Sequence, residues 1–522
     1  MGINLHHFLL SALAMSVPLA RTAAVSSANA SAACQFISAT GTETLTLQAD
    51  ALNPQWINAQ SHYWNAGNAD LYPACAVFPT SAEEVSQIVS ILQNNTGVTF
   101  AVKSGGHNPN VGFSSVDGGV LISMSNLSST VLSQDQTTVD IGPGARWVEV
   151  AEALDSSGVT VVSGRLGDVG VGGLTLGGGL SFLSAEYGLV CDNVVNYEVV
   201  LANASIVNAN AFTNSDLYWA LKGGGNQFGI VTKFTMKTHP IGQIWGGIRS
   251  YAATEAAAIL NATQDFTVNY YKDPKAAVIV TGEITIENLL ETFIVFFFYD
   301  GPSPPAGVFD EFNAIPFLTD GTKVQSYYDL INSGDSTNLY GLRYLIRATT
   351  LPNLPNANGK ALYNYHYNEW RNYVLTEGVL HPGFIFSLAF QPMPFIIPGH
   401  SVAAGGNALG MNPAEGDRMW MEYDISWLTA AGDDSAYSMA RSITATIDEY
   451  VKTTYAGIPN THYGSGDLEV EEYNPIFMND AMYDQKPLQS YENNGFAKLK
   501  AIQQSVDPSG LFPNRTGGFK FS

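Results

Sequence analysis

Apolar residues recur with two different periods along the chain, and their alternation predicts a fold that mixes helices and strands. Two short runs rich in β-branched and aromatic residues predict strands at 76–78 and 99–102. The segment between them carries an apolar stripe with helical spacing, formed by Val85, Ile88, Val89, Ile91 and Leu92. Ser81 and Glu84 precede the stripe with the spacing of a capping box, so a helix is expected to begin there.

The same mixture of short strands and short helices continues to about Pro240. Further strands are expected at 120–124, 138–141, 194–201, 205–209 and 229–238, and helices at 54–64, 142–154 and 216–221. The strands at 194–201 and 205–209 are separated by a short turn, which predicts a hairpin.

Residues 245–470 have a different pattern, in which alternating apolar and aromatic strands are separated by amphipathic helices. Examples are the strands at 293–299 and 384–390 and the helix at 436–450. Tyr363, Tyr365 and Tyr367 recur with period two, which fits a half-buried strand, one face of a pocket or a core-facing patch.

The N-terminus predicts a signal peptide over residues 1–20. Phe8 to Ala20 is an apolar run too short to span a bilayer, and small residues follow it, so cleavage could fall anywhere up to about Ala30. A signal anchor is the competing interpretation, because histidines replace the usual basic residues before the run. The sequence therefore favours a secreted protein. Five sequons fit secretion, at Asn94, Asn126, Asn203, Asn261 and Asn514.

Charge and composition limit the possible partners. The 522 residues include 46 acidic and only 23 basic ones, a formal net charge of −23, which would repel nucleic acid and anionic membranes. We therefore expect neither as a partner. The nine histidines show no HxH or HExxH grouping, so no metal site is expected.

Two glycine-rich segments carry the strongest chemical signal. Lys103 to Asn108 reads KSGGHN, and Gly164 to Gly179 reads GRLGDVGVGGLTLGGG. Glycine permits positive φ and removes the Cβ that would block a close approach of the backbone. Exposed N–H groups in such turns bind phosphate, and His107 is placed where its imidazole could react.

KSGGHN resembles the R/K-S-G-G-H motif of the vanillyl-alcohol oxidase superfamily, the PCMH-type FAD-binding proteins, and in particular its berberine-bridge-enzyme-like branch. VGVGGLTLGGG, YGLVCDNVVNYEVVLANASIV, NSDLYWALKGGGNQFGIVTKFTM and the C-terminal blocks NDAMYDQKPLQSY and DPSGLFPNRTGGFKF resemble the family in the same order. The resemblance implies an α+β fold. It predicts a PCMH-type FAD-binding domain of two α+β subdomains at 35–240, and a substrate domain at 245–470 with an antiparallel sheet and helices on one side. Residues 474–522 would return to the FAD-binding domain.

The resemblance also implies the cofactor, FAD, bonded covalently to the protein through His107. The residues expected to bind FAD are His107, Lys103, Ser104, Gly105, Gly106, Asn108, Gly164, Val169, Gly170, Val171, Gly172, Gly173, Gly177, Gly178 and Asn479. Many relatives attach the flavin a second time through a cysteine, but Leu166 occupies that position here. Val169 matches the position that controls access of dioxygen, and a valine there favours an oxidase.

The catalytic residues are less well defined, and four candidates are carried forward: Asp480, Tyr483, Gln391 and Asn407. Asp480 replaces the final tyrosine of the family's Y-x-N-Y motif, so it is a buried base, an exposed loop acid or a helix cap. Tyr483 is the other candidate base. Gln391 and Asn407 would either orient a substrate or serve a structural hydrogen bond.

The three cysteines divide into a pair and a single thiol. Related flavoproteins tie down the N-terminal segment with one bridge, which implies a Cys34–Cys75 disulfide, while Cys191 lies in an apolar run and is expected to be buried.

The sequence thus predicts a secreted FAD-dependent oxidase that passes hydride from a small organic, secondary-metabolite-like substrate to FAD and reduces dioxygen to hydrogen peroxide. A carbohydrate oxidase and a flavin-binding protein without turnover are the alternatives.

Overall fold

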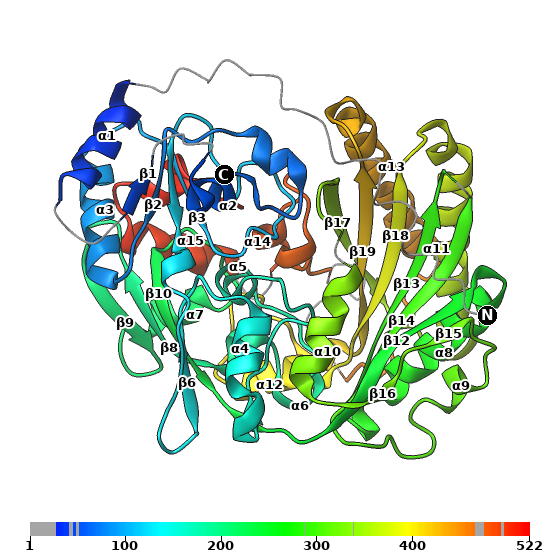
Figure 1. Cartoon of the computed structure of the whole chain (residues 1–522). Helices are drawn as coiled ribbons and strands as arrows, with labels where there is room; N and C mark the ends of the chain where they lie inside the picture. The colour runs from blue at the N-terminus through cyan, green and yellow to red at the C-terminus, as the bar shows by residue number, and fades with distance from the viewer. Residues whose placement is uncertain are drawn as a thin grey trace.

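The computed structural model describes residues 28–40, 45–47, 52–287, 289–337, 339–464, 474–491 and 495–521 (Figure 1). The expected signal peptide at residues 1–20 lies outside these ranges. Among the described residues, no helix is both long enough and apolar enough to cross a bilayer.

The N-terminal part of the chain builds a small sheet with helices beside it. Its strands follow the order β1-β2-β4-β3, in which β2, β4 and β3 are parallel and β1 is antiparallel. The strands are β1 (Leu45–Leu47), β2 (Cys75–Phe78), β3 (Phe100–Lys103) and β4 (Val120–Ser123). The flanking helices are α1 (Ala28–Ser38), α2 (Pro54–Ser61) and α3 (Ala82–Asn94). The expected Cys34–Cys75 disulfide is present and joins α1 to β2.

Helix α3 starts where the sequence predicts, but the Glu84 carboxylate accepts its hydrogen bond from a different backbone N–H. The Ser81 hydroxyl accepts a hydrogen bond from the Glu84 N–H (3.3 Å), as a capping box requires. The Glu84 carboxylate, however, accepts from the Thr80 N–H (2.7 Å) instead of the Ser81 N–H. The helix therefore begins where predicted, and its first turn is closed one residue earlier.

A second sheet is antiparallel, with the order β5-β6-β10-β8-β9. Its strands are β5 (Thr130–Leu132), β6 (Thr138–Ile141), β8 (Val194–Val200), β9 (Ile206–Asn210) and β10 (Ile230–Lys237), and β8 with β9 forms the predicted hairpin. The helix expected at 142–154 begins later, as α4 (Trp147–Leu154). Gly142 and Gly144 explain the difference, because a Cβ on either residue would lie within 2.1 Å of a backbone carbonyl oxygen, so they form a tight turn against the preceding loop.

The rest of the chain centres on one large antiparallel sheet with the order β15-β12-β14-β13-β18-β19-β17, to which β16 adds by pairing with β12. Its strands are β12 (Ile244–Ala252), β13 (Ala276–Thr285), β14 (Leu290–Tyr299), β15 (Thr319–Asp320), β16 (Lys323–Gln325), β17 (Arg343–Pro352), β18 (Ile385–Met393) and β19 (Arg418–Trp427). Three long helices, α8 (Ala256–Asn269), α11 (Asn356–Thr376) and α13 (Asp433–Thr454), cover its outer face in Figure 1. The other face turns toward the first two sheets.

Tyr363, Tyr365 and Tyr367 lie on helix α11, so the strand interpretation of these tyrosines was wrong. Tyr363 and Tyr367 are buried in the core, while the half-buried Tyr365 stacks on Tyr450 of α13 with 3.5 Å between ring centroids. None of the three lines the cavity described below. Three residues are too few to separate period two from a helix that is buried on more than one side.

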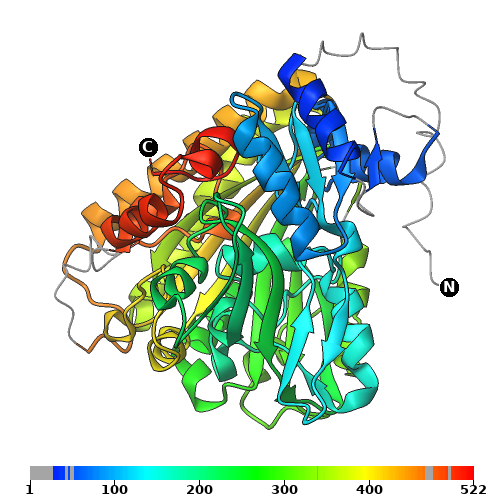
Figure 2. The ribbon, with the colours of Figure 1, turned by 90° about the vertical axis from the view of Figure 1, so that its left-hand side faces the viewer.

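The C-terminal segment packs against the N-terminal half of the molecule. It contains η12 (Met478–Asp480), α14 (Pro487–Ser490), α15 (Gly495–Val506) and α16 (Leu511–Arg515). The Arg515 guanidinium donates to the carbonyls of Leu92, Asn95 and Val98 at the end of α3 (2.7–3.0 Å). Figure 2 shows these red C-terminal helices beside the blue helices of the N-terminal part. This return brings η12 between the glycine-rich segments and the large sheet.

Candidate active site

A cavity of about 500 Å³ lies between the glycine-rich segments and the inner face of the large sheet. One wall, which we call the loop wall, consists of residues 104–109, 169, 170, 172–174, 176 and 177. The opposite wall, which we call the sheet wall, consists of inward-facing residues of β13, β14, β17, β18 and β19. Phe477, Met478, Asn479 and Asp480 close the space between the two walls.

The loop wall depends on direct contact between the two glycine-rich segments. A Cβ on Gly105 would lie 2.6 Å from the Gly170 nitrogen, and a Cβ on Gly170 would lie 2.2 Å from the Gly105 nitrogen. The Ser104 hydroxyl joins the same segments, because it donates to the Pro143 carbonyl (2.6 Å) and accepts from the Gly172 N–H (3.1 Å). These glycines therefore serve first to bring the two loops together.

Gly173 is different, because it faces the cavity. A Cβ at this position would meet no protein atom within 4 Å, so the side chain of any other residue would project into the cavity. Gly177 provides a platform for Asn479, whose side chain would lie 2.6 Å from a Cβ there. The Asn479 amide is fixed on this loop by hydrogen bonds with the Gly179 N–H (3.2 Å) and the Leu174 carbonyl (3.3 Å).

His107 opens onto the cavity from the end of the first loop. Its ring stacks on Trp64 with 4.6 Å between centroids and 10° between planes, and Trp64 in turn stacks on Tyr344 of β17 (4.1 Å). The Trp64 indole thus lies between the imidazole of His107 and the Tyr344 ring of the large sheet. Asn108, Val169 and Leu166 also line the cavity.

Lys103, one of the expected cofactor contacts, does not line the cavity. Its ammonium group donates to three backbone carbonyls, those of Asn58 (3.1 Å), Ala59 (2.8 Å) and His62 (2.9 Å). Burial lowers the pKa of Lys103 well below its ordinary value. The side chain therefore anchors the end of α2 behind the motif.

Six other expected site residues also lie away from the cavity wall: Gly164, Val171, Gly178, Gln391, Asn407 and Tyr483. Gly164 packs against Trp147, where a Cβ would lie 2.5 Å from the indole. The Asn407 amide donates to the buried carboxylate of Asp192 (3.0 Å), and Tyr483 is 46% exposed and accepts from Arg441 (2.8 Å). Sequence matching could not distinguish these neighbours of the site from its lining.

Asp480 does line the cavity, and it is buried. Gln391 of β18 donates to its Oδ2 atom through the side-chain nitrogen (2.8 Å), and Arg165 donates to the Gln391 oxygen. Burial raises the pKa of Asp480 to about 6, while the bond from Gln391 and the charge of Arg165 oppose the rise. Asp480 is therefore a carboxylate at neutral pH that takes up a proton in mildly acidic solution.

Three further carboxyl groups line the sheet wall, and no sequence motif pointed to them. Glu422 and Asp424 stand two residues apart on β19, so both face inward, and Glu283 on β13 faces the same way. Burial and the neighbouring acids raise the pKa of Asp424 to about 8 and that of Glu422 well above its usual range. Two acids at alternate positions of the otherwise apolar run MWMEYDISW were the available signal.

Register brings these acids into neighbouring rows across the sheet. Glu283 pairs with Ser387, which pairs with Asp424, and Thr281, Ala389 and Glu422 form the adjacent row. The acidic residues are therefore distributed unevenly over the cavity wall. Among the described residues of the cavity wall, carboxylates come only from this sheet and from Asp480, and none comes from the loop wall.

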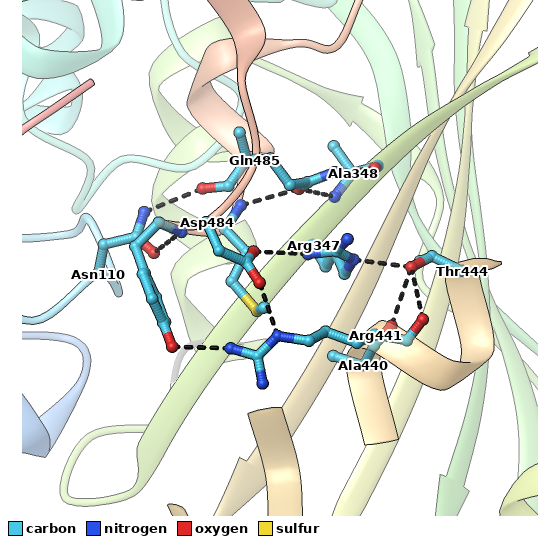
Figure 3. Close-up of polar contacts among 11 residues, drawn as sticks. Asn110, Arg347, Ala348, Ala440, Arg441, Thr444, Asp484 and Gln485 are labelled. Atoms are coloured by element: carbon cyan, nitrogen blue, oxygen red, sulfur yellow. Dashed lines mark hydrogen bonds and ion pairs between the residues drawn. The ribbon is translucent and has the colours of Figure 1, made fainter. Parts of the chain in front are cut away.

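Ion pairs and hydrogen bonds attach the segment that carries Asn479 and Asp480 to the large sheet (Figure 3). Asp484 accepts from Arg347 of β17 (2.7 Å) and from Arg441 of α13 (2.6 Å). The side chain of Gln485 bonds both backbone groups of Ala348 (3.0 and 2.7 Å), and Asn110 accepts from the Tyr483 N–H (2.8 Å). These contacts hold the segment that contains Asp480 in a defined position relative to the large sheet.

The residues of this cavity fit FAD. Phosphates need exposed backbone and no nearby carboxylates, and the loop wall offers the open backbone at Gly173 without an acidic side chain on its lining. An isoalloxazine ring needs apolar walls with a few polar groups, which Leu166, Val169 and the amide of Asn479 supply.

The comparisons with known proteins agree with this arrangement. A family model described as an FAD binding domain matches residues 73–210. The chain is 38% identical over 465 residues to an uncharacterised FAD-linked oxidoreductase of Arthroderma benhamiae, covering 88% of this chain and 90% of that protein. It is 32% identical over 450 residues to the bifunctional solanapyrone synthase of Alternaria solani, covering 86% and 81% of the two chains.

The fold also matches that of known flavoenzymes. The glucooligosaccharide oxidase of Acremonium strictum, described as carrying a 6-S-cysteinyl, 8α-N1-histidyl FAD, superposes with a TM-score of 0.72 at 21% identity, covering 93% of this chain and 99% of that one. The expected α+β fold is thereby confirmed.

Proposed function

Because the chain belongs to the family of FAD-linked oxidoreductases, we propose that it is a secreted oxidase that carries FAD on His107 and oxidises a small organic molecule. One observation carries this proposal. A single cavity has a carboxylate-free loop wall with His107 at its end, and the buried carboxylate of Asp480 lies between this wall and the sheet wall opposite. The first half is suited to a dinucleotide, and the second half to a substrate that must lose a proton.

FAD bound in this cavity would accept a hydride from the substrate and then return two electrons, with two protons, to dioxygen as hydrogen peroxide. The chain's own part is to hold the substrate and to take the proton that leaves with the hydride. Asp480 is the base we assign, because it is ionised at neutral pH and lies on the cavity wall. Attachment through His107 alone follows from Leu166, because a leucine cannot bond a flavin.

The sheet wall favours a compact and largely apolar substrate. Between its carboxyl groups it presents Ile279, Ile294, Phe296, Ile346 and Ile385. A cavity of about 500 Å³ must first accommodate FAD, which leaves limited room for a second molecule. A second candidate is carbohydrate oxidation, favoured by the hydroxyl groups of Thr281, Ser387 and Ser426 on the same wall as the acids and by the fold shared with a glucooligosaccharide oxidase.

Secretion is supported by the Cys34–Cys75 disulfide, since such bonds persist in oxidising compartments. The sequons at Asn94, Asn126, Asn203 and Asn514 are exposed and could carry glycans. Asn261 lies within α8, and its side chain accepts from Asn364 (3.0 Å), so we do not expect modification there.

The test is a hydrogen peroxide assay of the purified protein with panels of alcohols, phenols and sugars. Turnover of small apolar alcohols or phenols would support the first candidate, and turnover of sugars would support the second. If the protein is yellow but produces peroxide with no compound in either panel, the proposed oxidase activity is wrong and a flavin-binding role without turnover takes its place.

A further inference from the structure

We propose that Arg165 and Gln391 are positioning residues that determine which oxygen of Asp480 exchanges a proton with the substrate. The two side chains form a relay, Arg165 to Gln391 to Asp480, that occupies one carboxylate oxygen and leaves the other toward the cavity. The inference rests on the proposed function only in naming Asp480 as the base. The hydrogen bonds of the relay do not depend on that function.

The direction of the Gln391 amide is forced by its neighbours. Arg165 donates to the Gln391 oxygen, and a guanidinium group can only donate. The Gln391 nitrogen must therefore point the other way, where it donates to Oδ2 of Asp480 (2.8 Å). Gln391 is 1% exposed, so bulk water does not offer its side chain another partner.

This orientation restricts the proton on Asp480. An amide N–H needs an acceptor, so Oδ2 has to present a lone pair whether Asp480 is ionised or neutral. A protonated oxygen is the weaker acceptor, so a proton taken up by Asp480 favours Oδ1 and leaves Oδ2 as the carbonyl oxygen that accepts from Gln391. Because Asp480 lines the cavity and Oδ2 is already occupied, Oδ1 is the atom available to the substrate.

The neutral amide between the two charges also tunes the base. A direct Arg165–Asp480 ion pair would hold the pKa of the carboxyl low, occupy its oxygens and make it a poor proton acceptor. The hydrogen bond from Gln391 stabilises the Asp480 carboxylate less than a direct ion pair would. Burial therefore raises the pKa of Asp480 to about 6. A base with a pKa near the working pH is the most effective one.

Other charged groups near Asp480 come from β19 and from the loop that contains Arg165. The charge of Asp480 contributes to the raised pKa of Glu422 and of Asp424, while Arg165 counteracts the rise in Glu422. Behind the relay, Arg165, Gln391, Ser181 and Tyr270 surround a void of about 10 Å³, which holds at most one water molecule. Bulk water therefore does not replace the relay.

The experiment is an infrared pH titration of the whole flavin-containing protein. The carboxylic acid C=O band that is missing in Asp480→Asn reports protonation of Asp480 and requires no substrate. We expect it to titrate near pH 6 in the natural protein. In Gln391→Leu the midpoint should rise by about one pH unit, a tenfold gain in proton affinity, because the donated hydrogen bond is lost.

Two further variants separate a relay from a merely structural contact. Arg165→Met should raise the midpoint as well, but much less in the Gln391→Leu background, because the two groups act through one bond. Gln391→Glu keeps the shape of the side chain and places two carboxyl groups together, so they should share a proton and raise the midpoint further. The matched control is Gln264→Leu, which removes another buried amide, on α8, that donates to the Leu354 carbonyl (2.9 Å). It should leave the midpoint unchanged.

An unchanged midpoint in both Gln391→Leu and Gln391→Glu would overturn the relay, as would an Arg165→Met shift of equal size with and without Gln391. If Gln391→Leu does not fold, Gln391→Glu decides alone. The proposed function fails separately. If Asp480→Asn produces peroxide at the natural rate while the midpoints shift as expected, the relay stands and another group is the base.

Discussion

The two walls of the cavity are built in opposite ways. The loop wall comes from two short stretches, 104–109 and 169–177, and what it offers is mostly backbone made accessible by glycine. The sheet wall comes from five strands spread over more than 140 positions, from Ile279 to Ser426, and what it offers is side chains aligned by strand register. The loop wall is therefore built from short local segments of the chain, whereas the sheet wall exists only after the sheet has formed.

The largest expected effect concerns the end of the loop wall. His107→Ala should abolish covalent attachment, so the denatured protein should lose its yellow colour on a gel or filter. His381→Ala, in the loop before β18, is the control and should keep the colour. Flavin that stays with the denatured His107→Ala protein would place the bond elsewhere.

The second prediction separates the two uses of glycine within the loop wall. Gly170→Ala places a Cβ 2.2 Å from the Gly105 nitrogen, so the loops must separate, at a cost of about 1–3 kcal/mol in unfolding free energy. Gly173→Ala adds the same methyl group where nothing lies within 4 Å, so stability should hold while flavin content falls. Thermal melting and the ratio of flavin to protein absorbance measure both effects. Equal melting temperatures for the two variants would mean that loop contact is not what Gly170 provides.

The third prediction tests the sheet side of the cavity. Asp480→Asn should slow substrate-driven bleaching of the flavin about 10²- to 10⁴-fold, the usual contribution of a general base. In the natural protein this rate should rise as the pH passes through about 6, because the raised pKa of Asp480 keeps it protonated and unable to accept a proton below that value. Asp480→Asn should lack this rise. A retained rise would indicate that a neighbouring acid titrates in its place.

The smallest expected effect concerns Val169, which lines the cavity between the two walls. Val169→Ile adds one methylene in a packed interior and should obstruct dioxygen, so the yellow spectrum should return more slowly after reduction. Reduction by substrate should change much less, because it uses the sheet side of the cavity. Stopped-flow absorbance separates the two steps. Equal slowing of both would indicate general distortion, and a natural rate of recovery would mean that dioxygen enters by another route.

The sequence by itself determined the features that depend on neighbouring residues. The start of α3 at Ser81, the β8–β9 hairpin, the glycine turns and the placement of His107 all follow from local spacing, because caps, turns and close backbone approaches need particular residues at particular offsets. The resemblance to a flavoprotein family rested on the same local motifs, and so did the expected disulfide.

Only the tertiary structure decided the rest. Arg165 and Gln391 are 226 positions apart, and no local pattern links them. Glu283 and Asp424 share a row because strand register places them there. Lys103 points away from the cavity because its ammonium group donates to three backbone carbonyls in and just after α2. Long-range pairing, and the cost of leaving a buried charge without a partner, selected these arrangements.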